Sequence, residues 1–358
     1  MKGNEVSRRA SRWSAFEAIA RIESARRTLN RVSRVDWHRL AAGTAMIALM
    51  AQAQAAYFPM TFPMALPGGG ISGVAGGTAA PPVSEETTSG VETIIGGYVG
   101  IPSHNRSDVH IVRPDGTDLT MKGLRWDGEP FTFPLYAGVR AVHWRGSFGG
   151  MIDFLHDKAV TRVGKGAHGR RVTGERAIVD TVELEGKIKG QPAPPSAKIT
   201  DIVERLEFTH GHNMLLPTAM LRLGYLAPRL RPYVGVGAGV ALPHVEVWPT
   251  GEGEAAKTNE YQAAGPAMQF VFGLEWQGAR GPVFVEYKYT WADLKTALTG
   301  GKTPAWCNCD FVSDAARHIS NWWNGVQPQY GSLHTTLVTH QIVGGAGYRV
   351  SGAAAVQK

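Results

Sequence analysis

From residue 91 to residue 350 the chain alternates between two kinds of position with a period of two, which is typical of β-strands. In the segment 283–291 one face carries Val, Val, Tyr, Tyr and Trp, and the other carries Phe, Glu, Lys and Thr. An apolar outer face with aromatic residues at the strand ends is typical of a transmembrane barrel rather than a soluble sandwich. The pattern predicts eight strands, at 92–112, 131–144, 148–159, 213–226, 231–247, 263–277, 282–293 and 335–350.

The connections between these strands alternate in length. Those after the second, fourth and sixth strands are short, at 145–147, 227–230 and 278–281. The others are long, at 113–130, 160–212, 248–262 and 294–334. Outer-membrane barrels have short periplasmic turns and long extracellular loops, and an even strand number lets the sheet close. The sequence therefore predicts an all-β fold, an eight-stranded antiparallel up-and-down transmembrane β-barrel over residues 91–350, followed by a tail at 351–358.

The N-terminus has the organisation of an export signal. Residues 1–39 are basic, residues 40–50 are apolar, and Ala51-Gln52-Ala53-Gln54-Ala55 has the small-residue spacing of a cleavage site. An uncleaved anchor is the alternative, but the apolar run is shorter than the about 20 residues that span a bilayer. We predict a signal peptide at 1–55 with a long basic n-region, cleaved after Ala53 or Ala55. A Pro/Gly/Ser-rich disordered linker is expected at 56–90.

The net charge of +7 comes mostly from this signal. Residues 1–39 hold ten basic and four acidic side chains, and the remaining chain holds 27 basic and 26 acidic ones. The barrel therefore lacks the diffuse positive surface of a nucleic-acid-binding protein. The glycines at 235, 237 and 239 precede no helix, which argues against a nucleotide site. We expect a monomer that contacts outer-membrane lipid and lipopolysaccharide.

Strand parity places charged side chains inside a narrow lumen. They could form a catalytic or proton-handling cluster, but buried charges need partners whatever the function. We favour an ion-pair network that fills the lumen. The lumen charge network predicted in this way consists of Arg140, Asp153, Arg222, Glu275, Glu286 and Lys288.

Histidines gather toward the outer end of the predicted barrel. The segment 208–213, Phe-Thr-His-Gly-His-Asn, is the densest part, and two His at i and i+2 of a strand share a face. Such a pair could ligate a metal or supply acid and base groups, or it could be an ordinary polar rim. Whether a metal or other cofactor is used is left open. The candidate catalytic residues are His210, His212, Glu207 and Asn213.

Cys307 and Cys309 lie one residue apart in the last long loop. In an oxidising compartment we do not expect both cysteines to stay free thiols. A disulfide ring closed over one intervening residue, however, is strained. Their state is left open, because C-x-C alone is a weak signal for a metal or a reactive thiol.

Several segments resemble a group of alphaproteobacterial outer-membrane barrels described as similar to rhizobial lipid A oxidase. These are Tyr98-Val99-Gly100, Arg113-Pro114-Asp115-Gly116-Thr117-Asp118, Trp126-Asp127-Gly128, Pro134-Leu135-Tyr136-Ala137-Gly138, residues 208–213 and Arg231-Pro232-Tyr233-Val234-Gly235-Val236-Gly237. The resemblance covers residues 91–350. It implies an oxygen-dependent enzyme that converts the proximal glucosamine of lipid A to 2-aminogluconate, with molecular oxygen as co-substrate. It carries over no catalytic residues.

Two function hypotheses follow. The first is an enzyme that modifies lipid A from the outer leaflet, as an oxidase. The second is a non-enzymatic structural or surface-exposed barrel, which the lack of any recognised catalytic motif favours. A solute channel fits poorly, because eight strands leave little lumen.

Overall fold

The computed structural model describes residues 90–301 and 310–351. The predicted signal peptide, nearly all of the predicted linker and tail, and Cys307 and Cys309 lie outside the described residues. Those parts of the sequence analysis stay predictions. Within the described ranges, no helix has the length and apolar character needed to cross a membrane.

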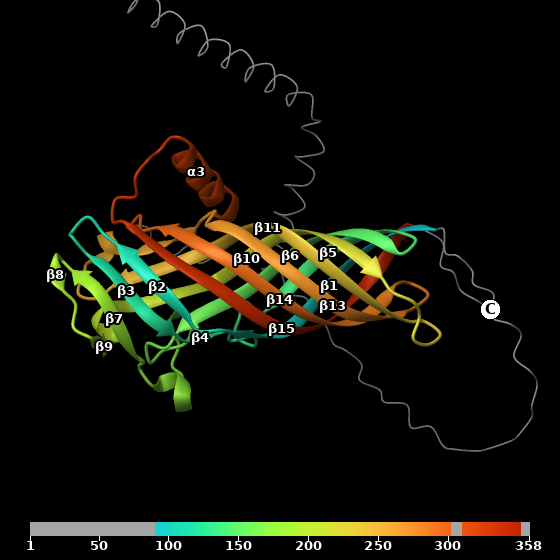
Figure 1. Ribbon diagram of the computed structural model, residues 1–358, viewed down its shortest axis with the longest axis horizontal. Helices are drawn as coiled ribbons and strands as arrows, with labels where there is room; N and C mark the ends of the chain where they lie inside the picture. Colours follow the sequence, from blue (N-terminus) through green and yellow to red (C-terminus); the bar gives the residue numbers. More distant parts are fainter. Residues whose placement is uncertain (1–89, 302–309, 352–358) are drawn as a thin grey trace, which may run out of the picture. The chain divides into compact units, whose positions relative to one another are not determined.

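Eight long antiparallel strands form a closed ring (Figure 1). Each pairs with the next, and the first pairs with the last from Thr93↔Ser351 to His104↔Thr339. Closure leaves none of these strands with an unpaired edge over its membrane-spanning part. The predicted barrel is confirmed. Its strands are β1 (Val91–His104), β5 (Ala137–Arg145), β6 (Phe148–Thr161), β10 (Val203–Arg222), β11 (Leu230–Pro249), β13 (Gly265–Gln277), β14 (Pro282–Ala297) and β15 (Ser332–Ser351).

The short turns and long connections fall at opposite ends of the ring, as predicted. The strand boundaries differ most in three places. The predicted first strand, 92–112, is two strands: the ring strand β1 ends at His104, and residues 107–112 form a separate strand outside the ring. Residues 131–136 are not a strand, because Pro130 and Pro134 cannot donate to a ladder. In addition, β10 begins ten residues earlier than expected, at Val203.

The long loops contain ordered structure rather than irregular chain. Short strands extend the sheet beyond the ring, with β2 against β15, β3 against β2 and β7 against β3. Within the described residues, four 3-10 helices and one α-helix complete the outer end. The added elements are β2 (Ser107–Val112), β3 (Asp118–Leu124), β4 (Trp126–Asp127), η1 (Ala167–Gly169), η2 (Gly174–Ala177), β7 (Thr181–Ile188), β8 (Gln191–Pro192), β9 (Ser196–Lys198), η3 (Ile199–Asp201), η4 (Glu254–Ala256), β12 (Thr258–Tyr261) and α3 (Phe311–Trp323).

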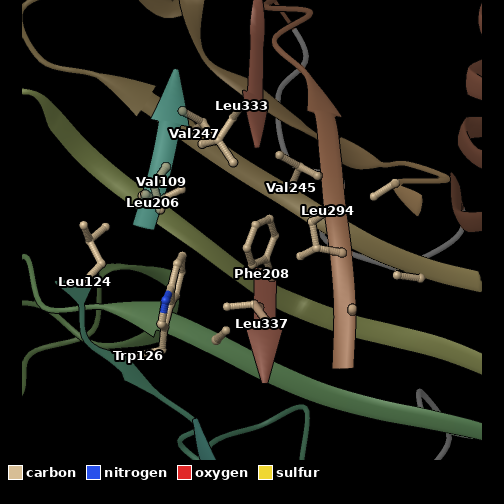
Figure 2. Packing of buried hydrophobic residues seen from close by; sticks show 14 of the residues in the cluster. Val109, Leu124, Trp126, Leu206, Phe208, Val245, Val247, Leu294, Leu333 and Leu337 are labelled. Atoms are coloured by element: carbon tan, nitrogen blue, oxygen red, sulfur yellow. The ribbon is translucent and has the colours of Figure 1, made fainter. Parts of the chain in front are cut away.

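Apolar side chains fill the interior at this outer end. Phe208 of β10 stacks on Trp126 with ring centroids 5.7 Å apart, and Leu337 of β15 lies beside it (Figure 2). Val109 of β2 and Leu124 of β3 belong to the same cluster. The outer hairpins therefore share one core with inward side chains of the ring strands, and this shared core explains why they are ordered.

The outer wall of the ring carries the lipid-facing belt, a set of exposed apolar side chains. A soluble protein has its apolar side chains inside; apolar side chains outside, together with a charged interior, are characteristic of a transmembrane barrel. The belt includes Ile95, Val99, Ile101, Phe148, Ile152, Val236, Met268, Phe270, Phe272, Trp276, Val283, Val285, Tyr287, Ile342 and Tyr348.

The lumen holds the six predicted charges, all of them buried. Arg140 pairs with Glu286, which also accepts a hydrogen bond from the Tyr233 hydroxyl at 2.7 Å. Lys288 pairs with Asp153, and Tyr98 donates to Asp153 at 2.8 Å. Nε of Arg222 lies 2.6 Å from a carboxylate oxygen of Glu275. Arg222 also pairs with Glu92, which Arg349 contacts at 2.7 Å, so acids and bases balance across the lumen network.

Candidate functional site

The segment of β10 that holds the predicted site residues is irregular. Its register shifts between Glu207 and His212 against both neighbouring strands. Gly211 lies inside this bulge with φ of 126°, a conformation that L side chains rarely adopt. The bulge breaks the alternation of faces, so the expectation that His210 and His212 share a face is wrong.

His212 is buried and lies against Phe208 of the interior core, with ring centroids 6.2 Å apart. Asn213 instead contacts the neighbouring strand, where its Oδ1 accepts a hydrogen bond from Nδ1 of His156 at 2.9 Å. Neither residue has a described contact with Glu207 or His210. The four predicted catalytic residues therefore separate, and only Glu207 and His210 stay together.

Glu246 is the centre of the group that contains His210. Its Oε1 accepts a hydrogen bond from the Thr209 hydroxyl at 2.8 Å and lies 2.9 Å from Nδ1 of His210. Nδ1 of His244 and Nδ1 of His168 lie 3.3 Å and 3.9 Å from the same oxygen. We call this group the outer-wall cluster; it consists of His168, Arg205, Glu207, Thr209, His210, His244 and Glu246.

Strand β11 places the cluster on the lipid-facing side of the sheet. Ala241, Val245 and Val247 belong to the interior core, so the alternate positions face outward. That outward column begins with Val236, which is 49% exposed, and continues to His244 and Glu246. An apolar band about 25 Å tall takes roughly ten residues of a tilted strand. His244 and Glu246 therefore lie just beyond the hydrocarbon, at the level of the lipid headgroups.

The loop after β6 brings the remaining histidine to the cluster. The His168 backbone N–H donates to Glu207 at 3.0 Å, and the Glu129 carboxylate accepts from the N–H of Ala167 at 3.2 Å. His168 has φ of 57°. This left-handed conformation costs free energy in a residue other than glycine, so the surrounding contacts must hold His168 there.

The charge state of His168 suits a ligand or a base. Burial and the neighbouring His210 lower the pKa of His168 to about 4. The imidazole is therefore neutral at physiological pH. The side chains of His168 and His210 remain 24% and 21% exposed. A small molecule or headgroup can reach their free faces.

A series of aromatic rings runs from the cluster to helix α3. His210 lies 4.6 Å from His244, His244 lies 4.7 Å from Tyr261, and Tyr261 lies 4.9 Å from Phe311 between ring centroids. Phe311, the first residue of α3, also lies edge-on to Phe154 of β6 at 6.1 Å. Figure 1 shows α3 beside the outer end of the barrel. The helix therefore borders the cluster on its lipid side.

Two ion pairs to β12 fix α3 in this position. Arg317 and His318 both contact the Glu260 carboxylate, at 2.6 Å and 2.5 Å. Burial raises the pKa of Glu260, but hydrogen bonds from His318, Arg317 and Thr299 outweigh it and lower the pKa to about 2. The opposite side of α3 exposes Val312, Ile319, Trp322 and Trp323.

Sequence reasoning missed Glu246, His168 and His244 as site residues. Strand parity could have found two of them, because His244 and Glu246 are polar residues in an otherwise apolar outward column of β11. His168 carried no such signal, because its position depends on how the long loop folds back.

A groove of about 540 Å³ elsewhere on the wall lies between β5, β6 and β10 and is lined by His143, Gly150 and Ala219, among others. It is mostly apolar and lies toward the end with the short turns. It shares no residue with the outer-wall cluster, so it is not the same site.

The closed ring, the lipid-facing belt and the charged lumen define a transmembrane β-barrel protein of the bacterial outer membrane. The chain matches no protein-family model, and no curated protein matches it. Among solved structures it is similar to the outer membrane protein OprG from Pseudomonas aeruginosa, at 9% identity and a TM-score of 0.30, covering 72% of this chain and 94% of that one. It is also similar to Neisserial surface protein A, at 7% identity and a TM-score of 0.26, covering 71% and 95%.

Proposed function

We propose that this barrel modifies the lipid A part of lipopolysaccharide in the outer leaflet. In particular, we propose an oxygen-dependent oxidase that converts the proximal glucosamine to 2-aminogluconate. The observation that carries the proposal is the position of the outer-wall cluster. Histidine and glutamate side chains converge on the lipid-facing side of β11, at headgroup level.

The surroundings of the cluster fit an amphipathic substrate. Phe131, Phe133 and Leu135 are exposed in the loop that Glu129 ties to the His168 loop. On the other side, α3 exposes Trp322 and Trp323. Tryptophan favours the membrane–water interface. A lipid whose acyl chains lie in the bilayer and whose sugars lie above it would therefore meet apolar contacts on both flanks.

The proposed reaction balances with molecular oxygen as the oxidant. The anomeric carbon of the reducing-end sugar loses two electrons and two protons, which pass to oxygen and give hydrogen peroxide. Water then opens the resulting lactone to the acid, so the sugar gains one oxygen atom overall. A basic side chain of the outer-wall cluster would take the anomeric hydroxyl proton.

The experiment is to incubate refolded, detergent-solubilised protein under air with lipid A whose proximal glucosamine has a free anomeric hydroxyl, and to follow the lipid by mass spectrometry. We expect product that contains one additional oxygen atom, no product under argon, and at least about a 100-fold loss in a folded Glu246→Gln variant. His110→Ala is the matched control, because His110 contacts Asp118 in the outer hairpin and lies outside the cluster. An unchanged lipid A with folded wild-type protein would refute the proposal.

A second candidate is a non-enzymatic surface barrel. The observation that favours it is the ordered outer sheet, in which β2, β3 and β7 extend well beyond the ring. Such a protein would leave lipid A composition unchanged when its gene is deleted. A lipid A profile of the deletion strain beside its parent separates the two candidates.

A further inference from the structure

We propose that His168, His210 and Glu246 bind a divalent transition-metal ion on the outer wall of the barrel. A use of that ion in oxygen chemistry rests on the proposed oxidase function, whereas the binding rests on the geometry of the three side chains. The three ligand atoms lie within 4.8 Å of one another.

The separations of the ligand atoms match a coordination shell. Nδ1 of His210 and Nδ1 of His168 lie 2.9 Å and 3.9 Å from Oε1 of Glu246. In a tetrahedral site with metal–ligand bonds of roughly 2.0–2.2 Å, neighbouring ligand atoms are about 3.3–3.6 Å apart. The two separations from Glu246 differ from this range by a few tenths of an ångström, and the ligand nitrogens of the two histidines lie within 4.8 Å of each other.

Hydrogen bonding alone explains this arrangement poorly. Thr209 and three histidines converge on one carboxylate oxygen, which has only two lone pairs to offer. Nδ1 of His244 is buried and makes no hydrogen bond, although it lies 3.3 Å from that oxygen. If a cation is bound there, the imidazole nitrogens and the carboxylate oxygen all coordinate it through lone pairs. The nitrogens then no longer compete as hydrogen-bond donors for one oxygen.

Neighbouring side chains hold the three ligands in place. Arg205 donates to Oε2 of Glu246 at 2.8 Å and so leaves Oε1 for the ion. Glu207 accepts the His168 backbone N–H and the Thr209 hydroxyl, at 3.0 Å and 3.2 Å. Such outer contacts orient ligands and tune metal affinity in known sites. Arg205 and Glu207 are therefore positioning residues.

The set of two histidines and one carboxylate indicates which ions fit. Catalytic zinc sites use it with an open fourth position, and non-haem iron(II) oxygenases use it with several open positions. The side chains of His168 and His210 are 24% and 21% exposed, which leaves room for such open positions. Given the proposed oxygen chemistry, we assign iron(II) as the physiological ion and use zinc(II) and cobalt(II) as probes.

The first test measures binding without any activity. Untagged full-length protein is refolded, treated with chelator and titrated with cobalt(II), and bound metal is determined by elemental analysis. We expect one ion per chain for the wild type and for His110→Ala. His168→Ala, His210→Ala and Glu246→Gln should each weaken binding at least about tenfold. Equal binding by the wild type and the Glu246→Gln variant would overturn the proposal.

A second measurement needs no variant and so does not depend on variant folding. Diethyl pyrocarbonate modifies accessible histidines, and peptide mapping identifies them. We expect zinc(II) to protect His168 and His210 while His110, whose side chain is 42% exposed, still reacts. Unchanged modification of His168 and His210 in saturating zinc(II) would contradict the site. Bound metal with unmodified lipid A refutes only the oxidase, and full lipid A conversion by metal-free protein refutes only the metal role.

Discussion

Two groups of buried charge in this barrel differ in how their members pair. In the lumen four bases face four acids: Arg140 and Lys288 contact Glu286 and Asp153, and Arg222 and Arg349 contact Glu275 and Glu92. In the outer-wall cluster three histidines approach a single carboxylate. A balance of acids and bases is what a narrow polar interior needs. Convergence on one oxygen is costly for packing alone, and it indicates that the cluster serves a function.

The largest expected effect concerns the lumen. Lys288→Met leaves Asp153 buried without its partner, and both side chains are fully buried. We expect a loss of about 3–5 kcal/mol of stability, measured by urea unfolding in detergent micelles. The double variant with Asp153→Leu should recover most of it, because an apolar pair replaces the ion pair. A single variant as stable as the wild type would show that the pairing contributes little.

The next effect concerns the bulge that separates His210 from His212. In Gly211→Ala the added Cβ would lie 2.2 Å from the Asn213 side chain at a φ of 126°. We expect a cost of about 1–3 kcal/mol and a reduced yield of modified lipid A, because His210 shifts away from Glu246. Gly253→Ala is the control, because nothing lies within 4 Å of its Cβ position. If Gly211→Ala behaves like that control, the bulge does not set the site.

A smaller effect concerns the attachment of α3 and its dependence on pH. The folded pKa of Glu260, about 2, is below its ordinary 4.5. Its ion pairs with Arg317 and His318 therefore stabilise the docked helix fully above pH 4.5, and this stabilisation is lost as the pH falls toward 2. Hydrogen-exchange protection of α3 amides should decrease across that window in the wild type. In Glu260→Gln it should be low and flat; a parallel decrease in both proteins would exclude Glu260 as the cause.

The smallest effect concerns the exposed tryptophans of α3, at 78% and 80% exposure for Trp322 and Trp323. If they contact the lipid substrate, the Trp322→Ser/Trp323→Ser variant should raise KM about fivefold, equivalent to ~1 kcal/mol of lost apolar contact. Because these side chains are remote from the cluster, kcat should stay unchanged. An unchanged KM would place the substrate elsewhere.

The barrel itself could be predicted from the sequence because the alternation of residues within each strand identifies its lipid-facing and its lumen-facing side. The alternation over 283–291 and the alternating loop lengths sufficed to count the strands and to place Lys288 and Glu286 in the lumen. The site could not be predicted in the same way. The bulge at Gly211 changes the face of His210, and His168 reaches Glu246 only through a loop that folds back across 39 residues of sequence from Glu207. Assigning residues to alternate faces assumes a strand without bulges, and it does not predict which loop residues fold back onto the strand.

The most direct test of the account compares two folded variants in one lipid A assay. Glu246→Gln removes the carboxylate of the outer-wall cluster, and Lys288→Met/Asp153→Leu replaces a lumen pair with apolar side chains. The account predicts that the first forms at least about 100-fold less oxidised lipid A than the wild type while the second forms a comparable amount. Full product from Glu246→Gln, or loss of product only in the lumen variant, would contradict it.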